Sequence, residues 1–274
     1  MSPRPFQPQV FALLAALLEE HAGLHHGGAD AEIAWQKLTT RAEEAGFESL
    51  LDYYYFLRYD DPQGVELRAL IDAVVVRETY FFREQDQLRA LVDQVIVPAV
   101  KDRGRARVWS AACSTGEEPL SIAMMLADRG VLERVDILAS DVSDRSIERA
   151  RAGQFAARAL RAVDPAGPTA RWLTRDERGN AVIDRAIASR VTWFRQNLLD
   201  EAAIAAMPPF DAILCRNVLI YFADPTIVRV VRALAGALRP GGVLLVGVSE
   251  SLLRLDVPVT CEERGGAFLY RKPA

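Results

Sequence analysis

The chain has 274 residues, of which 50% are hydrophobic and 26% charged, and its formal net charge is −4. This composition is typical of a folded globular protein and leaves little room for a long disordered segment. The length suffices for a small domain followed by a medium-sized one. Because affinity for nucleic acid needs a basic surface, the negative charge argues against a nucleic-acid-binding protein. We therefore expect a protein or small-molecule substrate.

Targeting and redox features point to a cytoplasmic protein. No stretch reaches the roughly 20 apolar residues of a membrane-spanning helix, so we expect no membrane insertion, and residues 1–8 lack the apolar region of a signal peptide. The three cysteines, Cys113, Cys215 and Cys261, form no CxxC pair. An odd number without that spacing predicts reduced thiols, with neither a disulfide framework nor a thiolate metal site.

All three histidines, His21, His25 and His26, lie in the first tenth of the chain. The spacing of His21 and His25 would suit two metal ligands on one helix. A polar helix end before Gly27-Gly28 explains the cluster more simply, and we predict no metal site. Because the rest of the chain has no imidazole, histidine-dependent hydrolysis is disfavoured.

The N-terminal part of the chain is helical in pattern. From Gln9 to Ala73, apolar residues recur at intervals of three and four, which predicts amphipathic helices. We place a small helical domain at residues 1–76. Residues 77–104 then link it to a second domain.

Beyond Gly104, short apolar runs alternate with helical stretches. This pattern is typical of a parallel sheet covered by helices, so residues 105–274 are predicted to form an α/β domain. The predicted strands are Ala106–Ala111, Val135–Ala139, Val191–Phe194, Phe210–Cys215 and Val243–Val248. The predicted helices are Glu117–Arg129, Asp144–Ala152 and Asp224–Leu238, the last ended by Arg239-Pro240-Gly241-Gly242.

Two hairpins complete the predicted domain. Residues 168–190 contain two β-like stretches around Gly179-Asn180, which predicts a hairpin inserted into the topology of the sheet. The final stretches, Val259–Arg264 and Ala267–Arg271, predict an antiparallel pair with Gly265-Gly266 at the turn.

The segment Val108–Pro119 predicts a strand, a tight loop of small residues and a helix, an arrangement that lets a ligand approach the backbone. It is not a GxGxxG motif, because Gly116 is its only glycine and the acidic Glu117 and Glu118 would repel a pyrophosphate. A cationic ligand without phosphate, such as S-adenosylmethionine, suits it better. Asp141, at the end of the second strand, suits the ribose hydroxyls of that cofactor or of NAD. As alternatives, Glu118 is an ordinary first-turn residue and Asp141 an N-cap.

Three polar residues, Arg216, Asn217 and Tyr221, interrupt an apolar run after the fourth strand. Ligands bind at the carboxyl ends of parallel strands, which makes these residues candidates for a site. The alternative is that Asn217 forms a turn and Tyr221 is a half-buried core aromatic.

Through most of its length the sequence resembles the chemotaxis receptor glutamate methyltransferases, the CheR type. The resemblance rests on the order and spacing of Thr79–Glu84, Trp109–Pro119, Ala139–Asp141, Asn197–Leu199, Phe210–Asn217 with Ile220–Phe222, and Arg239-Pro240. It implies a small N-terminal all-α domain followed by a Rossmann-like class I S-adenosylmethionine methyltransferase domain with the inserted β-hairpin. The linker at residues 77–104 would begin the cofactor site.

The resemblance also implies roles for individual residues. Arg83 and Tyr221 would face the methyl group as catalytic residues. Glu118 would hold the methionine amino group of the cofactor, Asp141 the ribose, and Asn197-Leu198 the adenine. The residues implied to surround the cofactor are Thr79, Arg83, Ala112, Glu118, Asp141, Asn197, Leu198, Arg216 and Asn217.

The implied reaction transfers a methyl group to glutamate carboxylates of chemoreceptors and leaves S-adenosylhomocysteine. An ionised glutamate is already a nucleophile and a sulfonium already an electrophile, so no general base is needed. The alternative is a cofactor-binding sensor or scaffold without methyl transfer. Arg83 and Tyr221, which a pure binder does not need, favour the enzyme. Methylation of nucleic acid or of a small molecule is disfavoured by the acidic charge.

The implied partner is the cytoplasmic helical domain of chemoreceptors, bound by a monomer. Family members often carry basic residues along a helix of the N-terminal domain, whereas the corresponding stretch, Lys37–Gly46, has Glu43 and Glu44 after Lys37 and Arg41. This puts basic steering by that helix in doubt. The hairpin near Gly179 looks shorter than in members that bind a receptor's C-terminal peptide, so such a tether is doubtful, unless hairpin length simply varies.

Overall fold

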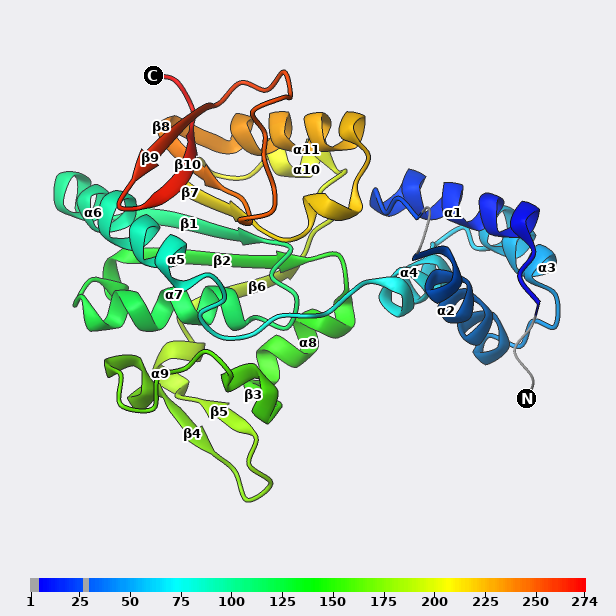
Figure 1. Cartoon of the computed structure of the whole chain (residues 1–274), viewed down its shortest axis with the longest axis horizontal. Coiled ribbons are helices and arrows are strands. Elements are labelled where there is room, and N and C mark those ends of the chain that lie inside the picture. The colour runs from blue at the N-terminus through cyan, green and yellow to red at the C-terminus, as the bar shows by residue number, and fades with distance from the viewer. Residues whose placement is uncertain (1–4, 27–29) are drawn as a thin grey trace. The chain divides into compact units, whose positions relative to one another are not determined.

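The computed structural model describes residues 5–26 and 30–274, and the chain folds into two compact units. The helical unit comprises Met1–Val76 with Tyr221–Thr226, and the sheet unit comprises Arg77–Ile220 with Ile227–Ala274. The fold is α/β with an all-α N-terminal part, as the sequence predicts (Figure 1).

The helical unit is built from short amphipathic helices. They are α1 Pro8–Ala22, α2 Ala31–Glu44, α3 Leu50–Tyr55, the π-helix η2 Phe56–Asp60 and α4 Val65–Val74. Fully buried leucines from three of these helices, Leu14, Leu38 and Leu70, form its core. Helix α1 ends at Gly23, which adopts φ 74° and donates its N–H to Glu19. His25 therefore lies beyond the helix, and the predicted helix end at Gly27-Gly28 lies outside the described residues.

The basic side chains of α2 are used inside the helical unit. Lys37 Nζ donates to the Val74 carbonyl at 2.9 Å. The Arg41 guanidinium donates to both carboxylate oxygens of Glu66, at 2.8 and 2.5 Å, and the Tyr53 hydroxyl donates to the same carboxylate at 2.6 Å. Both cations of α2 therefore fasten it to α4.

The sheet unit contains a seven-stranded sheet in the order β6-β2-β1-β7-β8-β10-β9. Its strands are β1 Ala106–Ala111, β2 Val135–Asp141, β6 Val191–Arg195, β7 Phe210–Cys215, β8 Leu238–Leu245, β9 Thr260–Arg264 and β10 Ala267–Arg271. The first five in this order are parallel, and β10 runs antiparallel to both of its neighbours. The strand order reverses between β1 and β7, and this switch point is where ligands bind in open parallel sheets.

Helices cover both faces of this sheet. Figure 1 shows α7 and α8 on one side and α10 and α11 on the other. The main α-helices of this part of the chain are α5 Gln85–Leu91, α6 Val97–Arg103, α7 Glu117–Asp128, α8 Asp144–Ala152, α10 Glu201–Ala205 and α11 Asp224–Ala237, whose residues up to Thr226 belong to the helical unit. Short helical turns are η3 Val92–Ile96, η4 Leu132–Arg134, η5 Ala157–Leu160, η6 Pro168–Trp172, α9 Arg185–Ala188 and η7 Leu219–Tyr221. Because helices cover both faces, the central strands β1 and β7 are almost wholly buried and mostly apolar in sequence.

The predicted extent of one strand is wrong at both ends. Strand β8 begins at Leu238, and its pairing with β7 jumps from Phe210↔Leu238 to Ala212↔Val243. The predicted turn at 239–242 is therefore a bulge inside the strand, with Gly241 at φ 73°. The strand ends at Leu245 instead of Val248, because Gly247 N–H donates to Glu250 and turns the chain. Strand β2 also continues past Ala139 to Asp141.

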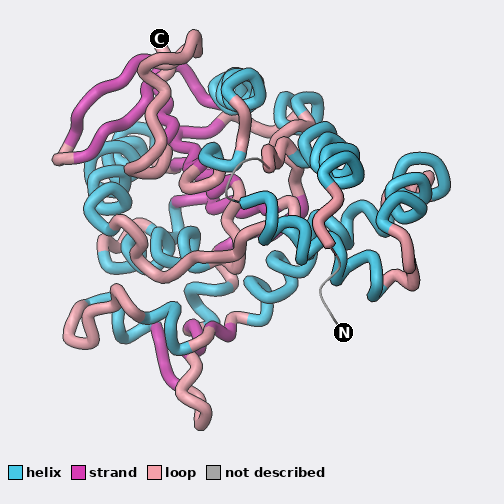
Figure 2. Tube along the Cα trace, turned by 45° about the vertical axis from the view of Figure 1, so that its right-hand side comes forward, coloured by secondary structure: helices cyan, strands magenta, loops and turns pink. Residues whose placement is uncertain are grey.

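A small antiparallel sheet, β3-β5-β4, is inserted between α8 and β6 (Figure 2). Its strands are β3 Gln154–Phe155, β4 Leu173–Arg175 and β5 Ala181–Ile183. The predicted hairpin around Gly179-Asn180 is confirmed, and Asp176 closes its turn by accepting the N–H groups of Arg178 and Asn180. Strand β3 is not predicted, because two residues are too short for a periodicity.

The three thiols differ in accessibility. Cys113 and Cys215 are 2% and 0% exposed, whereas Cys261 is partly exposed, and all three are free. Burial raises the pKa of the Cys113 and Cys215 thiols well above its usual range, with nearby carboxylates adding to the shift. We predict that iodoacetamide alkylates only Cys261 in the native protein and all three after denaturation, as counted by mass spectrometry. Native labelling of Cys113 would contradict this burial.

Among the described helices, none combines the length and apolarity needed to cross a membrane.

Candidate active site

The loop between β1 and α7 has an unusual backbone. Ala112 and Ser114 adopt φ 60° and 50°, and Gly116 adopts φ 95°. Left-handed conformations are costly for residues other than glycine and concentrate at functional sites. A Cβ added at Gly116 would lie 2.7 Å from Trp193 and 2.8 Å from Ala150, so only glycine lets α7 start this close to β6 and α8. The loop therefore turns sharply at the switch point of the sheet.

Asp141 lies at the end of β2, directly against this loop. One carboxylate oxygen accepts the Ser114 N–H at 2.8 Å and the other accepts the Ser143 N–H at 3.0 Å. The N-cap of α8 is Ser143, whose hydroxyl accepts from Ser146 N, so the alternative of Asp141 as N-cap is wrong. Because each carboxylate oxygen has two lone pairs, Asp141 keeps acceptor capacity for hydroxyl donors.

The segment after β6 lies beside Asp141. Gln196 N–H donates to the Asp141 carbonyl at 3.0 Å. The next residues, Asn197 and Leu198, are therefore held close to the end of β2; Leu198 is 6% exposed, and the Asn197 side chain accepts the Leu199 N–H. This segment thus offers an apolar side chain and an amide next to the carboxylate, a combination that suits a purine and its ribose.

Arg216, just after β7, is a buried cation between two carboxylates. Its side chain is 1% exposed and donates to Glu118 at 2.7 Å and to Glu84 at 2.9 Å. It also donates to the backbone carbonyl of Arg83 at 2.9 Å. Glu118 additionally accepts the Ser110 hydroxyl at 2.6 Å, so it is more than an ordinary first-turn residue of α7. This acid–arginine–acid cluster brings three segments that are distant in sequence to one point.

Glu84 attaches the segment Thr79–Glu84 to the switch point of the sheet. Burial alone would raise the pKa of Glu84, but the Arg216 guanidinium and hydrogen bonds from Val248 N–H and the Asn217 amide outweigh burial and lower that pKa. Glu84 is therefore a carboxylate at neutral pH. Its own backbone has φ 54°, which turns the chain between Arg83 and α5.

Asn217 is fixed from both sides. It adopts φ 57°, as expected of a turn former, and its N–H donates to Glu250 at 2.7 Å. Glu250 also accepts the N–H of Gly247 at 2.6 Å and that of Ile220 at 3.3 Å. A Cβ at Gly247 would lie 2.6 Å from the side-chain nitrogen of Asn217 and 2.8 Å from Glu250 Oε2, so a larger residue here would displace both side chains.

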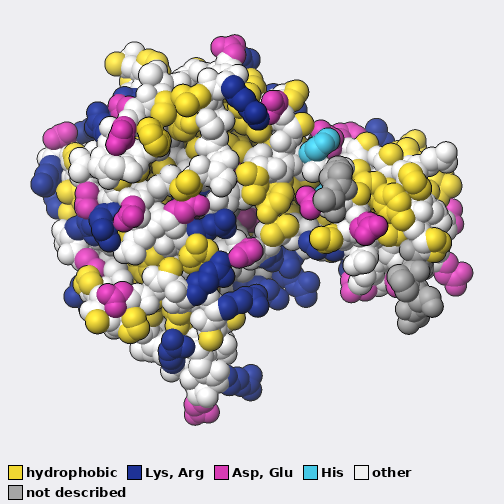
Figure 3. All heavy atoms as spheres, viewed as in Figure 1, with side chains coloured by type: hydrophobic (Ala, Val, Ile, Leu, Met, Phe, Trp, Pro, Cys, Tyr) yellow, Lys and Arg dark blue, Asp and Glu magenta, His cyan; other side chains and the backbone are white. Residues whose placement is uncertain are grey.

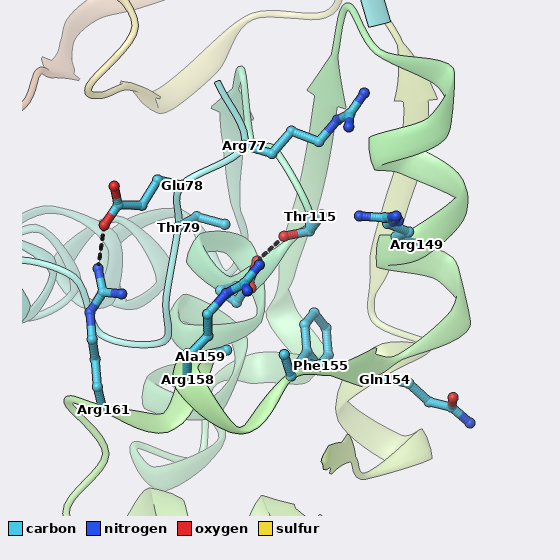
Figure 4. Close-up of a pocket in the computed structure, with 12 residues that line it drawn as sticks. Arg77, Glu78, Thr79, Thr115, Arg149, Gln154, Phe155, Arg158, Ala159 and Arg161 are labelled. Carbon is cyan, nitrogen blue, oxygen red and sulfur yellow. Dashed lines mark hydrogen bonds and ion pairs between the residues drawn. The ribbon is translucent and has the colours of Figure 1, made fainter. Parts of the chain in front are cut away.

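Thr79 and Arg83 occupy the segment anchored by Glu84. Thr79 lines a pocket of ≈ 580 Å³ together with Thr115 (Figure 4). The Arg83 guanidinium donates to the Glu78 carbonyl at 3.1 Å, lies 5.8 Å from the centre of the Tyr80 ring, and is 29% exposed. Its side chain is thus partly available to a substrate, while its backbone is tied to Arg216.

Most predicted site residues therefore lie at one edge of the sheet unit. One hydrogen-bonded cluster contains Glu118, Arg216, Asn217 and the backbone at Arg83. The adjoining loop contains Ala112, and beside it lie Asp141, Asn197 and Leu198. Tyr221, by contrast, groups with the helical unit, where its carbonyl accepts the His25 N–H at 2.8 Å.

Sequence reasoning missed several residues of this edge, among them Glu84 and Glu250. Glu84 ends the segment Thr79–Glu84 that carried the resemblance, so its charge next to Arg83 was the available signal. Glu250 follows the carboxyl end of β8, the position where polar groups of a parallel sheet converge. Ser110 gave no signal, because a small residue inside a buried strand is ordinary.

The donor set fits S-adenosylmethionine. The edge offers the carboxylates of Glu118 and Asp141 to an amino group and to ribose hydroxyls, and acidic surroundings suit a sulfonium. Ser114 Oγ and Arg216 Nε are buried and have no hydrogen-bond partner among the described residues. Buried polar atoms of this kind need a partner, and a ligand with polar groups at this edge would supply one.

Asp141→Ala should weaken binding of S-adenosylhomocysteine by about 1–3 kcal/mol, because the ribose hydroxyls would lose their acceptor. Isothermal titration calorimetry measures the change. Asp136→Ala is the control, since Asp136 lies in the same strand but pairs with Arg105 and Arg107 away from the loop. Equal affinity of Asp141→Ala and wild type would remove Asp141 from the site.

The strand order, with β10 inserted antiparallel between β8 and β9, and an acidic site at the switch point define a class I S-adenosylmethionine-dependent methyltransferase. The family model described as "CheR methyltransferase, SAM binding domain" matches residues 77–264. Chemotaxis protein methyltransferase 2 of Vibrio cholerae is 37% identical over 81% of this chain and 78% of its own.

Two further relatives cover more of the chain. The chemotaxis protein methyltransferase of Klebsiella aerogenes is 35% identical over 92% of this chain and 86% of its own, and chemotaxis protein methyltransferase 1 of Pseudomonas aeruginosa is 32% identical over 95% and 97%. The chain belongs to the CheR methyltransferase family. The expectation of S-adenosylmethionine as its cofactor is thereby confirmed.

Proposed function

We propose that the chain methylates the side-chain carboxylates of glutamates on methyl-accepting chemotaxis receptors, in the cytoplasm and as a monomer. The observation that supports this most is the hydrogen bond from Arg216 to the Arg83 carbonyl at 2.9 Å. Arg216, whose guanidinium also pairs with Glu118, thereby holds the partly exposed Arg83 at the same edge of the sheet. A partly exposed guanidinium suits a carboxylate substrate.

The chemistry needs positioning more than proton transfer. When bound, S-adenosylmethionine supplies a methyl group on a cationic sulfur. A carboxylate oxygen of the substrate forms a bond to the methyl carbon as the carbon–sulfur bond breaks, and the bonding electrons stay on sulfur. The products are a neutral ester and a neutral thioether, so no proton moves. Because the reaction needs no general base, it does not require a histidine, and the chain has none outside its first 26 residues.

The residues of the chain divide this work. Glu118 and Asp141 hold the cofactor by its amino group and ribose, with Asn197 and Leu198 at the adenine. Arg83 aligns the incoming carboxylate for in-line attack, and the family resemblance assigns Tyr221 the same role. Strong pairing to Arg83 would stabilise the reactant, whose charge disappears in the reaction, so Arg83 contributes orientation more than electrostatic activation.

The experiment is incubation of the full-length chain with methyl-labelled S-adenosylmethionine and the cytoplasmic domain of a chemoreceptor from the same genome. We expect label on the receptor that alkali releases as methanol, as an ester requires. Label on RNA or on a metabolite instead would overturn the glutamate assignment. Tight cofactor binding without any transfer would favour the sensor or scaffold.

A receptor's C-terminal peptide should bind weakly or not at all. The β4 and β5 strands have three residues each, and Asp176 closes the turn between them, so the small sheet offers a short edge for an added strand. Fluorescence titration with a labelled peptide of the last residues of the receptor measures this. A micromolar dissociation constant would show that the short hairpin still binds a peptide.

A further inference from the structure

The pocket that Thr79 lines is rich in arginine. It lies wholly in the sheet unit, and its four arginines come from three segments: the chain before Thr79, helix α8, and the turn η5 with the residue after it. The charged residues lining it are Arg77, Arg149, Arg158, Arg161, Glu78 and Glu117. Figure 3 shows dark-blue side chains gathered over α8 and the small sheet, the same region of the surface.

Two of these arginines have guanidinium groups that are not paired with a carboxylate of the described residues. Arg149 and Arg158 are exposed, and the guanidinium group of neither forms a hydrogen bond or an ion pair with any residue in the described ranges. Figure 4 shows both pointing toward Thr115, Arg149 from α8 and Arg158 from η5. Arg161 differs, since it pairs with Glu78 at 2.9 Å and its guanidinium lies 3.7 Å from the centre of the Tyr80 ring.

The acids of the pocket do not neutralise this charge. Glu78 is already paired with Arg161. Glu117 is 4% exposed and accepts the Thr115 hydroxyl at 2.7 Å, so little of this residue is accessible from the pocket. Burial raises the pKa of Glu117, and the nearby Arg158 guanidinium, which forms no ion pair with it, opposes that rise. The accessible surface of the pocket is therefore positive.

The helical unit uses its cations differently. Lys37 and Arg41, the basic residues of α2, are held by Val74 and Glu66 inside that unit. Arg149 and Arg158, by contrast, have no such partners among the described residues. The cations available to an acidic protein partner thus include those beside the loop 112–116 in the sheet unit.

We propose that this arginine pocket docks an acidic segment of the protein substrate and so presents a neighbouring glutamate to the methyl donor. The proposal rests on the function proposed above. Guanidinium groups bind carboxylates in a planar, bidentate manner and are weakly hydrated, which favours them at protein interfaces. Arg158 lies in the 3₁₀ turn η5 and Arg161 is its C-cap, three residues further on, a spacing that places two side chains on the same side of such a turn. Thr79 and Thr115, which line the same pocket, connect it to the cofactor loop.

The first test is steady-state methyl transfer by full-length Arg149→Glu/Arg158→Glu. We expect KM for the receptor domain to rise about tenfold or more, because two attractive charges become repulsive. The kcat at saturating receptor should stay within about twofold, since neither residue orients the reacting carboxylate. The affinity for S-adenosylhomocysteine should not change. Added salt should raise KM more steeply for the wild type than for the variant.

The matched control is Arg134→Glu/Arg145→Glu. Both arginines are exposed and lie in the sheet unit outside the pocket, and their guanidinium groups make no hydrogen bond or ion pair with the described residues. This variant has the same net charge but should keep the wild-type KM. Equal KM values for the wild type and the pocket variant, or equal increases in both variants, would overturn the docking site while leaving the transferase function intact.

A second measurement does not depend on methyl transfer. The probe is a fluorescein-labelled, alanine-based helical peptide with glutamates at every third and fourth position, followed by fluorescence anisotropy. Binding to the wild type and to the control, with loss in the pocket variant, supports the docking site even if the wild type methylates no receptor. Absence of binding to the wild type, together with an unchanged KM, would refute it.

Discussion

Arg216→Ala is expected to lower the free energy of unfolding by about 3–5 kcal/mol and to abolish measurable methyl transfer, because removing one member of a buried ionic cluster leaves uncompensated buried charge. The side chain is 1% exposed and holds Glu84, Glu118 and the carbonyl of Arg83 at once. Denaturant unfolding followed by circular dichroism measures the loss. A loss no larger than that of an exposed ion pair would contradict this role of the cluster.

The control for Arg216→Ala is Arg232→Ala, which removes an exposed pair with Asp256 and should cost at most about 1 kcal/mol. The effect of Arg216→Ala should also depend on pH. Although burial raises the pKa of Glu84, pairing with Arg216 lowers it overall. A lowered folded-state pKa stabilises the protein above the unfolded-state pKa, and this contribution is lost as the pH falls through the folded-state value. The difference between wild type and variant should therefore shrink in acid; a constant difference would contradict the pairing.

Arg83→Ala and Tyr221→Phe should each lower single-turnover methyl transfer by about 100-fold, the usual cost of a mispositioned reacting group. Both are proposed to orient the substrate carboxylate. Because the Arg83 side chain is partly exposed and Arg83 is not one of the buried core residues, cofactor affinity and melting temperature should change little. Quenched-flow transfer to the receptor domain measures the rate.

Arg89→Ala is the matched control for Arg83→Ala, since Arg89 is an exposed arginine of the neighbouring helix α5 with a side chain 54% exposed. It should transfer at the wild-type rate. If Arg83→Ala and Tyr221→Phe also keep that rate on a validated receptor, the pocket orients glutamate through other groups.

The strands and helices were predictable from the sequence where their patterns were long. Strands β1 and β7 have the predicted bounds, because each is a mostly apolar run between polar turns. Strand β8 was mispredicted because Arg239-Pro240-Gly241-Gly242 has the composition of a turn, whereas the sheet accepts it as a bulge. The pairing of β3 with β5 depends on residues about 28 apart and leaves no local signal.

Some residues of the site were likewise predictable from the sequence, and others were not. The loop at Ala112–Gly116 and Asp141 were visible as strand ends, so their closeness followed from topology. The contact between Arg216 and Glu84 joins residues 132 apart in sequence, and no spacing rule predicts it. The same holds for Glu250, whose three backbone partners come from two different segments. Only the folded chain shows that acids surround Arg216.

The helical unit is not a continuous piece of sequence, because Tyr221–Thr226 returns to it from the middle of the sheet unit. His25 N–H bonds to the Tyr221 carbonyl, and a Cβ at Gly23 would lie 3.1 Å from the Phe222 ring. A fragment cut after Val76 would lose these contacts and expose the surface that they cover. A chimera of two relatives fused at that point would combine the N-terminal helices of one protein with residues 221–226 of the other. We therefore expect residues 1–76 and 221–226 to have been inherited together.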